Sequence, residues 1–258
     1  MRKTHTRGRV VCVGIQIMSG RKRFFVQNID TVNNTAVIDG DEFVHAKTVQ
    51  RVDVGSEICL LDGSGKEYTA IVTKVEKRQL LAHITGAEDS DREPKTKIYL
   101  LIGALKGDKT ELVVQKACEL GAERIGVFSS KYCAAFMNEN KLERLNKVAK
   151  EGAKQCMRSR APEIYYYENL QSALKSAMDY ENKLFACEFA KKSEINLSTL
   201  KGYTAIVVGS EGGFSEEEFQ LSKEMGFSAV YLGKRILRAE TAAIALLSIV
   251  AHTLGEME

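Results

Sequence analysis

The chain has 258 residues, 44% of them hydrophobic and 28% charged, and a formal net charge of +3. This composition is typical of a globular protein with a core of its own, and the net charge is too small to indicate a nucleic-acid-binding protein by itself. No run is apolar and long enough for a membrane span, and the six cysteines form no Cys-x-x-Cys pair, which argues against membrane proteins, zinc sites and disulfide frameworks and favours a reduced, cytoplasmic setting.

Residues 1–20 are interpreted as a basic N-terminal extension and are left out of the fold prediction. Their apolar part, Val10–Ile15, is too short for a secretory signal and has no convincing cleavage site after it. The basic stretch continues to Arg23, and a second basic cluster follows at 154–160. Clustered cations of this kind either attract RNA phosphates or form a solvated surface.

Residues 21–90 contain short apolar runs separated by turn residues, which predicts a small β-barrel or sandwich. The expected strands cover 23–26, 35–38, 57–61, 68–72 and 80–84, with a short helix within 43–51. The polar segment 87–97, which contains Pro94, is interpreted as a linker. A second domain is expected at 91–258.

Beyond the linker, apolar runs of strand length alternate with helical periodicity. The expected strands are 98–102, 125–128, 163–167, 184–189, 206–208 and 229–232, and the expected helices are 109–120, 138–157, 169–178, 215–226 and a final helix from about Thr241. Ser215 and Glu218 form a capping box. Such alternation predicts an α/β domain with a mostly parallel sheet covered on both faces.

Two of these strands end in glycine-bearing loops, Gly209–Gly213 and Gly233–Arg238. Ligands of open parallel sheets bind outside the carboxyl ends of the strands, where glycine lets the backbone approach a flat group. The alternative is that both loops are ordinary strand-to-helix connections that need glycine for their geometry.

The stretch Gly209-Ser-Glu-Gly-Gly-Phe-Ser, followed by Leu232-Gly-Lys-Arg-Ile-Leu-Arg-Ala-Glu-Thr-Ala, resembles the two signature loops of the bacterial 16S ribosomal RNA uridine-N3 methyltransferases of the SPOUT superfamily. Ser210 stands where proline is commoner in that family. The resemblance implies an α/β domain with a SPOUT-type trefoil knot and a mostly parallel sheet, preceded by a small PUA-like RNA-binding β-barrel. It also implies S-adenosylmethionine as cofactor, a homodimer, and 16S ribosomal RNA or the small ribosomal subunit as partner.

The resemblance also implies site residues. The cofactor-binding candidates are Gly209, Glu211, Gly212, Gly213, Leu232, Gly233, Ile236, Leu237 and Ala242, with Leu232, Ile236 and Leu237 as apolar walls. Arg158, in a third family-like motif at 154–164, and Arg238 are the catalytic candidates, because a guanidinium near the uracil carbonyls would stabilise the anion left when N3 loses its proton. The RNA-binding candidates are Arg21, Arg23, Lys106, Lys109 and Arg160.

Other readings remain open at this point. Gly103–Thr110 is close to the phosphate-binding P-loop pattern, but Asp108 occupies the second glycine position, where a carboxylate would repel phosphate. A non-catalytic RNA-binding or ribosome-assembly factor of the same fold is a further alternative. A knotted methyltransferase that acts on transfer RNA or on a ribose hydroxyl is the third.

Overall fold

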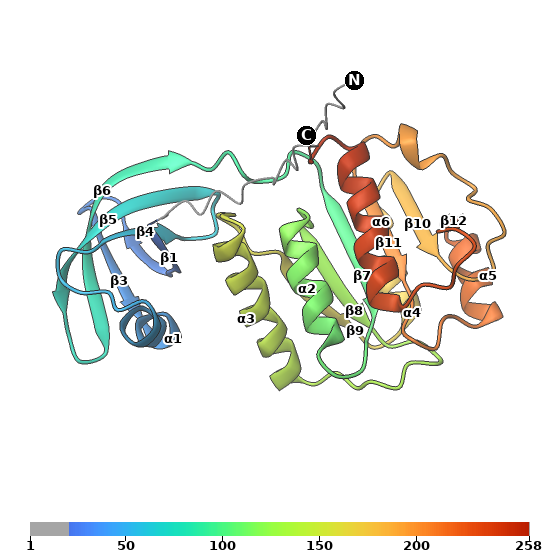
Figure 1. Cartoon of the computed structure of the whole chain (residues 1–258), viewed down its shortest axis with the longest axis horizontal. Coiled ribbons are helices and arrows are strands. Elements are labelled where there is room, and N and C mark those ends of the chain that lie inside the picture. Colours follow the sequence, from blue (N-terminus) through green and yellow to red (C-terminus); the bar gives the residue numbers. More distant parts are fainter. Residues whose placement is uncertain (1–20, 258) are drawn as a thin grey trace, which may run out of the picture.

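The computed structural model describes residues 21–257, so the extension predicted for residues 1–20 lies outside the described residues. The chain builds two six-stranded sheets that lie at opposite ends of an elongated molecule (Figure 1). It leaves the first sheet at Asp89 and enters the second at Ile98. The boundary placed between residues 90 and 91 stays a prediction that fits this interval.

The first sheet forms what we call the β domain. Its strands are β1 (Lys22–Phe25), β2 (Asn28–Asp30), β3 (Thr35–Asp39), β4 (Glu57–Leu61), β5 (Lys66–Val75) and β6 (Gln79–Asp89), in the order β1-β4-β5-β6-β3-β2. The five predicted strands are present. The sequence missed β2, because three residues with two polar side chains at a sheet edge carry no apolar alternation. The predicted helix is split into α1 (Gly40–Val44) and the π-helical turn η1 (His45–Val49).

The β5–β6 hairpin is longer than predicted. Residues 87–89 belong to β6, where they pair with residues 66–68 of β5, so the prediction that the linker starts at residue 87 was wrong. Backbone pairing continues past the apolar part of the strand because the ladder needs no apolar side chains. The apolar residues Leu80, Ala82 and Ile84 face a core that includes Phe24 and Ile58.

The second sheet forms the parallel-sheet domain. Its strands are β7 (Ile98–Gly103), β8 (Arg124–Phe128), β9 (Glu163–Tyr167), β10 (Asn182–Ala186), β11 (Thr204–Val208) and β12 (Ser228–Val230), in the order β12-β10-β11-β7-β8-β9. Every pairing in this sheet is parallel. The prediction of a mostly parallel sheet is confirmed.

Helices cover both faces of this sheet, as predicted. One face packs against α2 (Lys109–Glu119), α3 (Glu139–Gln155) and α6 (Ala239–Thr253), and the other against α4 (Leu170–Lys175) and α5 (Glu216–Glu224). Leu100 and Ile102 of β7 enter the first core, whereas Tyr99 and Leu101 enter the second, because successive side chains of a strand point to opposite faces.

Two boundaries near the carboxyl ends of the strands differ from the prediction. Strand β10 ends at Ala186 rather than at residue 189, because its neighbours provide partners only up to Val208 and Val230. Helix α6 begins at Ala239, two residues earlier than expected. Within residues 21–257, this helix and the others are too short or too polar to cross a lipid bilayer.

Candidate functional site

A cavity of about 710 Å³ opens at the carboxyl ends of β10, β11 and β12. Its walls are the ends of these strands, the loop that follows β11, and the loop between β12 and α6. The nine residues predicted as cofactor-binding all line it, namely Gly209, Glu211, Gly212, Gly213, Leu232, Gly233, Ile236, Leu237 and Ala242. The volume lies within the usual range for small-molecule sites, about 300–1,000 Å³. Two loops 19 residues or more apart in sequence therefore form one concave site.

The loop after β11 needs its glycines because backbone and side chains approach it closely. A Cβ on Gly212 would lie 2.6 Å from the carbonyl oxygen of Tyr132, and a Cβ on Gly209 would lie 3.0 Å from the ring of Phe214. Gly213 has a φ of +69°, in the left-handed region that favours glycine, and its N–H donates to the carbonyl of Ser210 at 3.0 Å. The loop thus turns tightly and presents bare backbone to the cavity.

The predicted capping box fixes the end of this loop. Ser215 Oγ accepts from the backbone N–H of Glu218 at 3.2 Å, and the Glu218 carboxylate accepts from the N–H of Ser215 at 2.9 Å. The same carboxylate also accepts from the N–H of Lys131 at 2.9 Å, in the loop after β8. The start of α5 is therefore hydrogen-bonded to the loop that follows β11 and to the loop that follows β8.

Because Ser215 is buried and supplies the cap, Ser215→Ala should lower the free energy of unfolding by about 1 kcal/mol. Denaturant titration of the two proteins measures the difference. Gln220→Ala, an exposed position in the same helix, is the control and should change stability by no more than about 0.5 kcal/mol. Equal stability of Ser215→Ala and the wild-type protein would contradict the role assigned to the cap.

The loop that resembles a P-loop holds an anion from its own chain. Glu211 accepts from the backbone N–H of Lys106 at 3.1 Å and from Lys109 Nζ at 3.2 Å, and Lys109 also lies 3.8 Å from Glu240. Burial raises the pKa of Glu211, but hydrogen bonds from backbone N–H groups and from Lys109 outweigh it, so the pKa lies below its ordinary value. A bound phosphate would need these same donors, and the Glu211 carboxylate already takes them. This arrangement argues against nucleotide triphosphate binding.

The prediction that Arg158 is catalytic was wrong. Its side chain is buried at the opposite edge of the sheet, near the amino end of β8, and is absent from the cavity lining. Its Nη1 donates to the carbonyls of Cys118 and Ala122 at 3.1 and 2.9 Å, and its Nε and Nη2 donate to Glu93 at 3.3 and 3.1 Å. A guanidinium with its donors committed in this way has no access to a substrate. Arg238, by contrast, is exposed and lines the cavity.

The RNA-binding candidates separate into two groups. Arg23 is buried and ion-paired with Glu67 at 2.7 Å, so its prediction as an RNA contact was wrong. Arg21, Lys106 and Arg160 are exposed, although Arg21 pairs with Glu57 and Arg160 donates to the carbonyl of Ser64. Lys109 lines the cavity, with its charge matched by Glu211 and Glu240. RNA binding by these four residues stays a prediction.

The structure also corrects one wall of the cavity and adds two residues to it. The side chain of Ile236 is 99% exposed, so it does not form an apolar wall within one chain. Glu188, whose carboxyl carbon would lie 3.1 Å from a Cβ on Gly213, was missed because residues 187–189 were assigned to a strand. Ser210 was noted only as an unusual residue. The residue lines the cavity, but its hydroxyl is buried and has no hydrogen-bond partner among residues 21–257.

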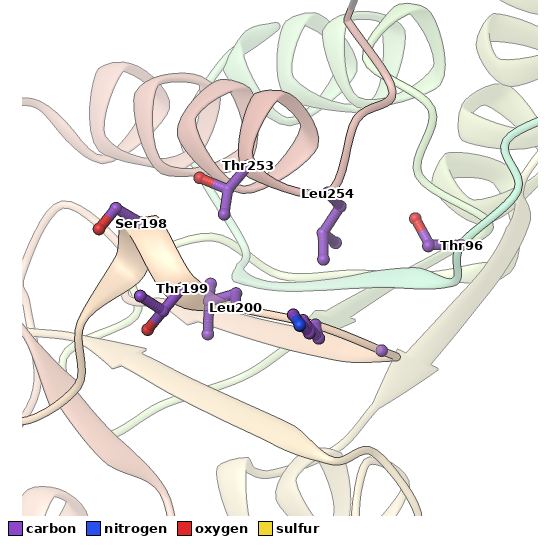
Figure 2. A pocket seen from close by; sticks show the side chains of 8 residues that line it. Thr96, Ser198, Thr199, Leu200, Thr253 and Leu254 are labelled. Carbon is purple, nitrogen blue, oxygen red and sulfur yellow. The ribbon is translucent and has the colours of Figure 1, made fainter.

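A second cavity, of about 690 Å³, lies at the amino ends of the strands (Figure 2). It is lined by Ser198–Leu200, by Thr96 before β7, and by Thr253 and Leu254 at the end of α6. Its hydroxyl groups already donate within the chain: Ser198 to Asn196, Thr199 to the Asn196 carbonyl and Thr96 to Glu256. The protons of these three hydroxyls are therefore committed within the chain, and we assign this cavity no function.

Comparison with known proteins gives consistent matches over both domains. A family model described as an RNA methyltransferase domain matches residues 92–251, and one described as an RNA methyltransferase PUA domain matches residues 38–85. Ribosomal RNA small subunit methyltransferase E from Mesomycoplasma hyopneumoniae is 34% identical over 88% of this chain and 97% of its own length, and that from Bacillus subtilis is 31% identical over 84% and 90%.

Solved structures of methyltransferases also match this chain over both domains. The Neisseria gonorrhoeae ribosomal RNA small subunit methyltransferase E bound to S-adenosyl methionine has a TM-score of 0.81 and 30% identity, over 91% of this chain and 98% of that one. A Legionella pneumophila methyltransferase in complex with bound SAM has a TM-score of 0.83 and 28% identity, over 90% and 98%.

Proposed function

Since this chain belongs to the ribosomal RNA small subunit methyltransferase E family, we propose that it transfers a methyl group from S-adenosylmethionine to N3 of a uridine in 16S ribosomal RNA. The observation that carries this proposal is the cavity at the carboxyl ends of β10, β11 and β12, which both signature loops line. The choice of N3 and of uridine comes from the likeness of those loops to the uridine-N3 methyltransferases.

The residues of the cavity fit an adenosyl group. The glycines of the β11 loop leave bare backbone against which a flat ring can lie. Leu232 and Leu237 supply apolar surface, and the exposed carboxylate of Glu188 can accept from ribose or ammonium donors. The cofactor supplies an electrophilic methyl group when bound, so the protein has to position it and exclude water.

Arg238 is the catalytic candidate that remains. The N3 proton of uridine is weakly acidic, and its loss places negative charge on the uracil carbonyl oxygens. A guanidinium at the mouth of the cavity, carried on the N-cap of α6, would stabilise that charge as it develops.

We expect Arg238→Ala to lower kcat by about 100-fold, the usual cost of removing one donor to a developing oxyanion. Affinity for S-adenosylhomocysteine, measured by calorimetry, should change little, because the guanidinium acts on the base. Arg238→Lys keeps the positive charge and should recover part of the rate. A rate within twofold of the wild-type enzyme for Arg238→Ala would remove Arg238 from the mechanism.

We also propose that the active form is a homodimer. Ile236 is 99% exposed at the mouth of the cavity, and Ile249, 41% exposed, lies two turns after the cavity residue Ala242 and hence on the same face of α6. A second copy packed on this face would cover both isoleucines and complete the apolar wall. Sedimentation at micromolar concentration tests this, and a fully active monomer would contradict it.

The substrate is tested by methyl transfer in vitro. Small ribosomal subunits, deproteinised 16S ribosomal RNA and transfer RNA from cells that lack the enzyme are incubated with deuterated S-adenosylmethionine, and nucleosides are analysed by mass spectrometry. We expect labelled 3-methyluridine in the small-subunit RNA, which also fits a cytoplasmic enzyme. Label in transfer RNA or on a ribose would replace the proposed substrate, and failure to bind the cofactor would favour a non-catalytic assembly factor.

A further inference from the structure

The β domain and the parallel-sheet domain meet along a seam of buried charge that the proposed chemistry does not use. Three ion pairs lie there: Arg23–Glu67 at 2.7 Å, Lys154–Glu42 at 3.1 Å and Arg158–Glu93 at 3.1 Å. Their side chains are between 5% and 19% exposed. We call these six residues the domain seam. The Lys154–Glu42 pair joins the two domains directly, since Glu42 belongs to α1 and Lys154 to α3.

Glu93 lies at the centre of the contacts between the connecting segment and the parallel-sheet domain. One carboxylate oxygen accepts from Nε and Nη2 of Arg158. The other accepts from the N–H of Ser159 at 2.7 Å, from its hydroxyl at 3.0 Å and from the N–H of Arg160 at 2.9 Å. One side chain therefore fastens the segment between the two sheets to the loop between α3 and β9.

That loop is in turn bonded to the β domain. Arg23 Nη2 lies 3.4 Å from the carbonyls of both Met157 and Arg158, and Arg160 donates to the carbonyl of Ser64. Met157 has a φ of +68°, a strained conformation that persists only where surrounding contacts fix it. The hydrogen bond from Arg23 also holds the pKa of Glu67 below its ordinary value, so this pair stays charged at neutral pH.

Buried ion pairs add little net stability, but they demand one geometry and leave a costly unpaired charge if one partner is lost. A seam built from them selects one angle between the domains. We propose that Glu93 is a positioning residue that fixes this angle, so that ribosomal RNA bound to the β domain reaches the cavity in the productive orientation. This inference rests on the proposed function, and it gives the 154–164 motif a role outside the cavity lining.

Steady-state kinetics on small ribosomal subunits, at saturating S-adenosylmethionine, test the inference. Glu93→Ala should raise KM for the subunit by about tenfold with kcat within about twofold, because productive docking is impaired while the cavity is unchanged. Calorimetry should give an unchanged affinity for S-adenosylhomocysteine. Glu93→Gln should have a KM between those of the wild-type protein and Glu93→Ala, because its amide oxygen still accepts from the N–H groups of Ser159 and Arg160. Asp91→Ala is the matched control in the same segment, since its side chain is 93% exposed.

A double variant separates positioning from stability. Glu93→Ala combined with Arg158→Met removes both charges, so no unpaired charge is left to unfold the protein. We expect a smaller loss of stability than for Glu93→Ala alone, together with the raised KM. Some loss remains because the hydrogen bonds from Ser159 and Arg160 to Glu93 and from Arg158 to the Cys118 and Ala122 carbonyls are also lost. A wild-type KM for the double variant, or an altered cofactor affinity for the stable Glu93→Gln variant, would overturn the inference.

Small-angle scattering gives a readout that does not depend on activity. The double variant should show a larger radius of gyration than the wild-type protein, because the domains are no longer held at one angle. A scattering profile of the double variant identical to that of the wild-type protein would show that Glu93 does not fix the angle between the domains. If the wild-type protein holds one arrangement but methylates no small subunits, the proposed function fails instead.

Discussion

Replacing Gly213 with valine (Gly213→Val) is expected to lower affinity for S-adenosylhomocysteine by at least about 100-fold, equivalent to about 2.7 kcal/mol. At a φ of +69° a side chain costs about 1–2 kcal/mol, and a β-branched one is the least tolerated. The added atoms would also meet the carboxylate of Glu188, which lines the same cavity. Glu188 can turn aside, but the backbone cost cannot be relieved without opening the turn. Calorimetry measures the affinity directly.

Gly226→Val is the matched control for this experiment. Gly226 follows α5 at a φ of +79°, so valine there carries the same backbone cost, but the nearest atom to its Cβ is Lys183 Cε at 3.8 Å and the position is outside the cavity. This variant should lose stability and keep its affinity for the cofactor product. Normal binding by Gly213→Val would show that the cavity has been assigned to the wrong ligand.

Phe214→Ala should lower the free energy of unfolding by about 3–5 kcal/mol, the usual range for a buried phenylalanine. The ring is 2% exposed, its centroid is 4.2 Å from that of Phe185 and it stacks on Phe128 at 6.3 Å. It packs under Gly209, at the start of the cavity loop. Its removal should therefore also weaken cofactor binding, because the loop loses its support. Denaturant titration and calorimetry measure the two effects.

Phe189→Ala provides the comparison. Phe189 is 43% exposed and stacks on Phe219 with ring centroids 5.6 Å apart, so its loss should cost about 1 kcal/mol or less. Saturating S-adenosylhomocysteine should restore part of the stability of Phe214→Ala, since a ligand bound only by the native state stabilises it. Equal destabilisation by the two variants would mean that the aromatic cluster beneath the loop does not anchor it.

Much of the fold could be predicted because its signals are local. The alternation of apolar strands and amphipathic helices after residue 97 predicted a parallel sheet with helices on both faces, and Ser215 with Glu218 predicted the start of α5. The prediction failed where the end of a strand is set by the strands paired with it. The end of β10 depends on where β11 and β12 stop, and the length of β6 depends on its pairing with β5.

The candidate site shows the same division. Glycine after two apolar strands is a local pattern that predicted two loops at one edge of the sheet, and the family resemblance of those loops implied nine residues, all of which line one cavity. The cations were harder, because lysine and arginine give the same local signal whether they face solvent, RNA or a buried carboxylate. Arg23, Arg158 and Arg238 illustrate this, since only Arg238 lies at the cavity.

By itself, the sequence determined the two kinds of sheet, the capping box and the pair of glycine loops, since each depends on residues within a few positions of one another. Only the tertiary structure decided which charges are buried. Arg23 meets Glu67 across 44 residues within the β domain, and Arg158 meets Glu93 across 65, and such partners are selected by how distant segments of the chain pack together. A buried cation requires an acceptor wherever the fold supplies one, so its role follows from the assembled core and not from its neighbours in sequence.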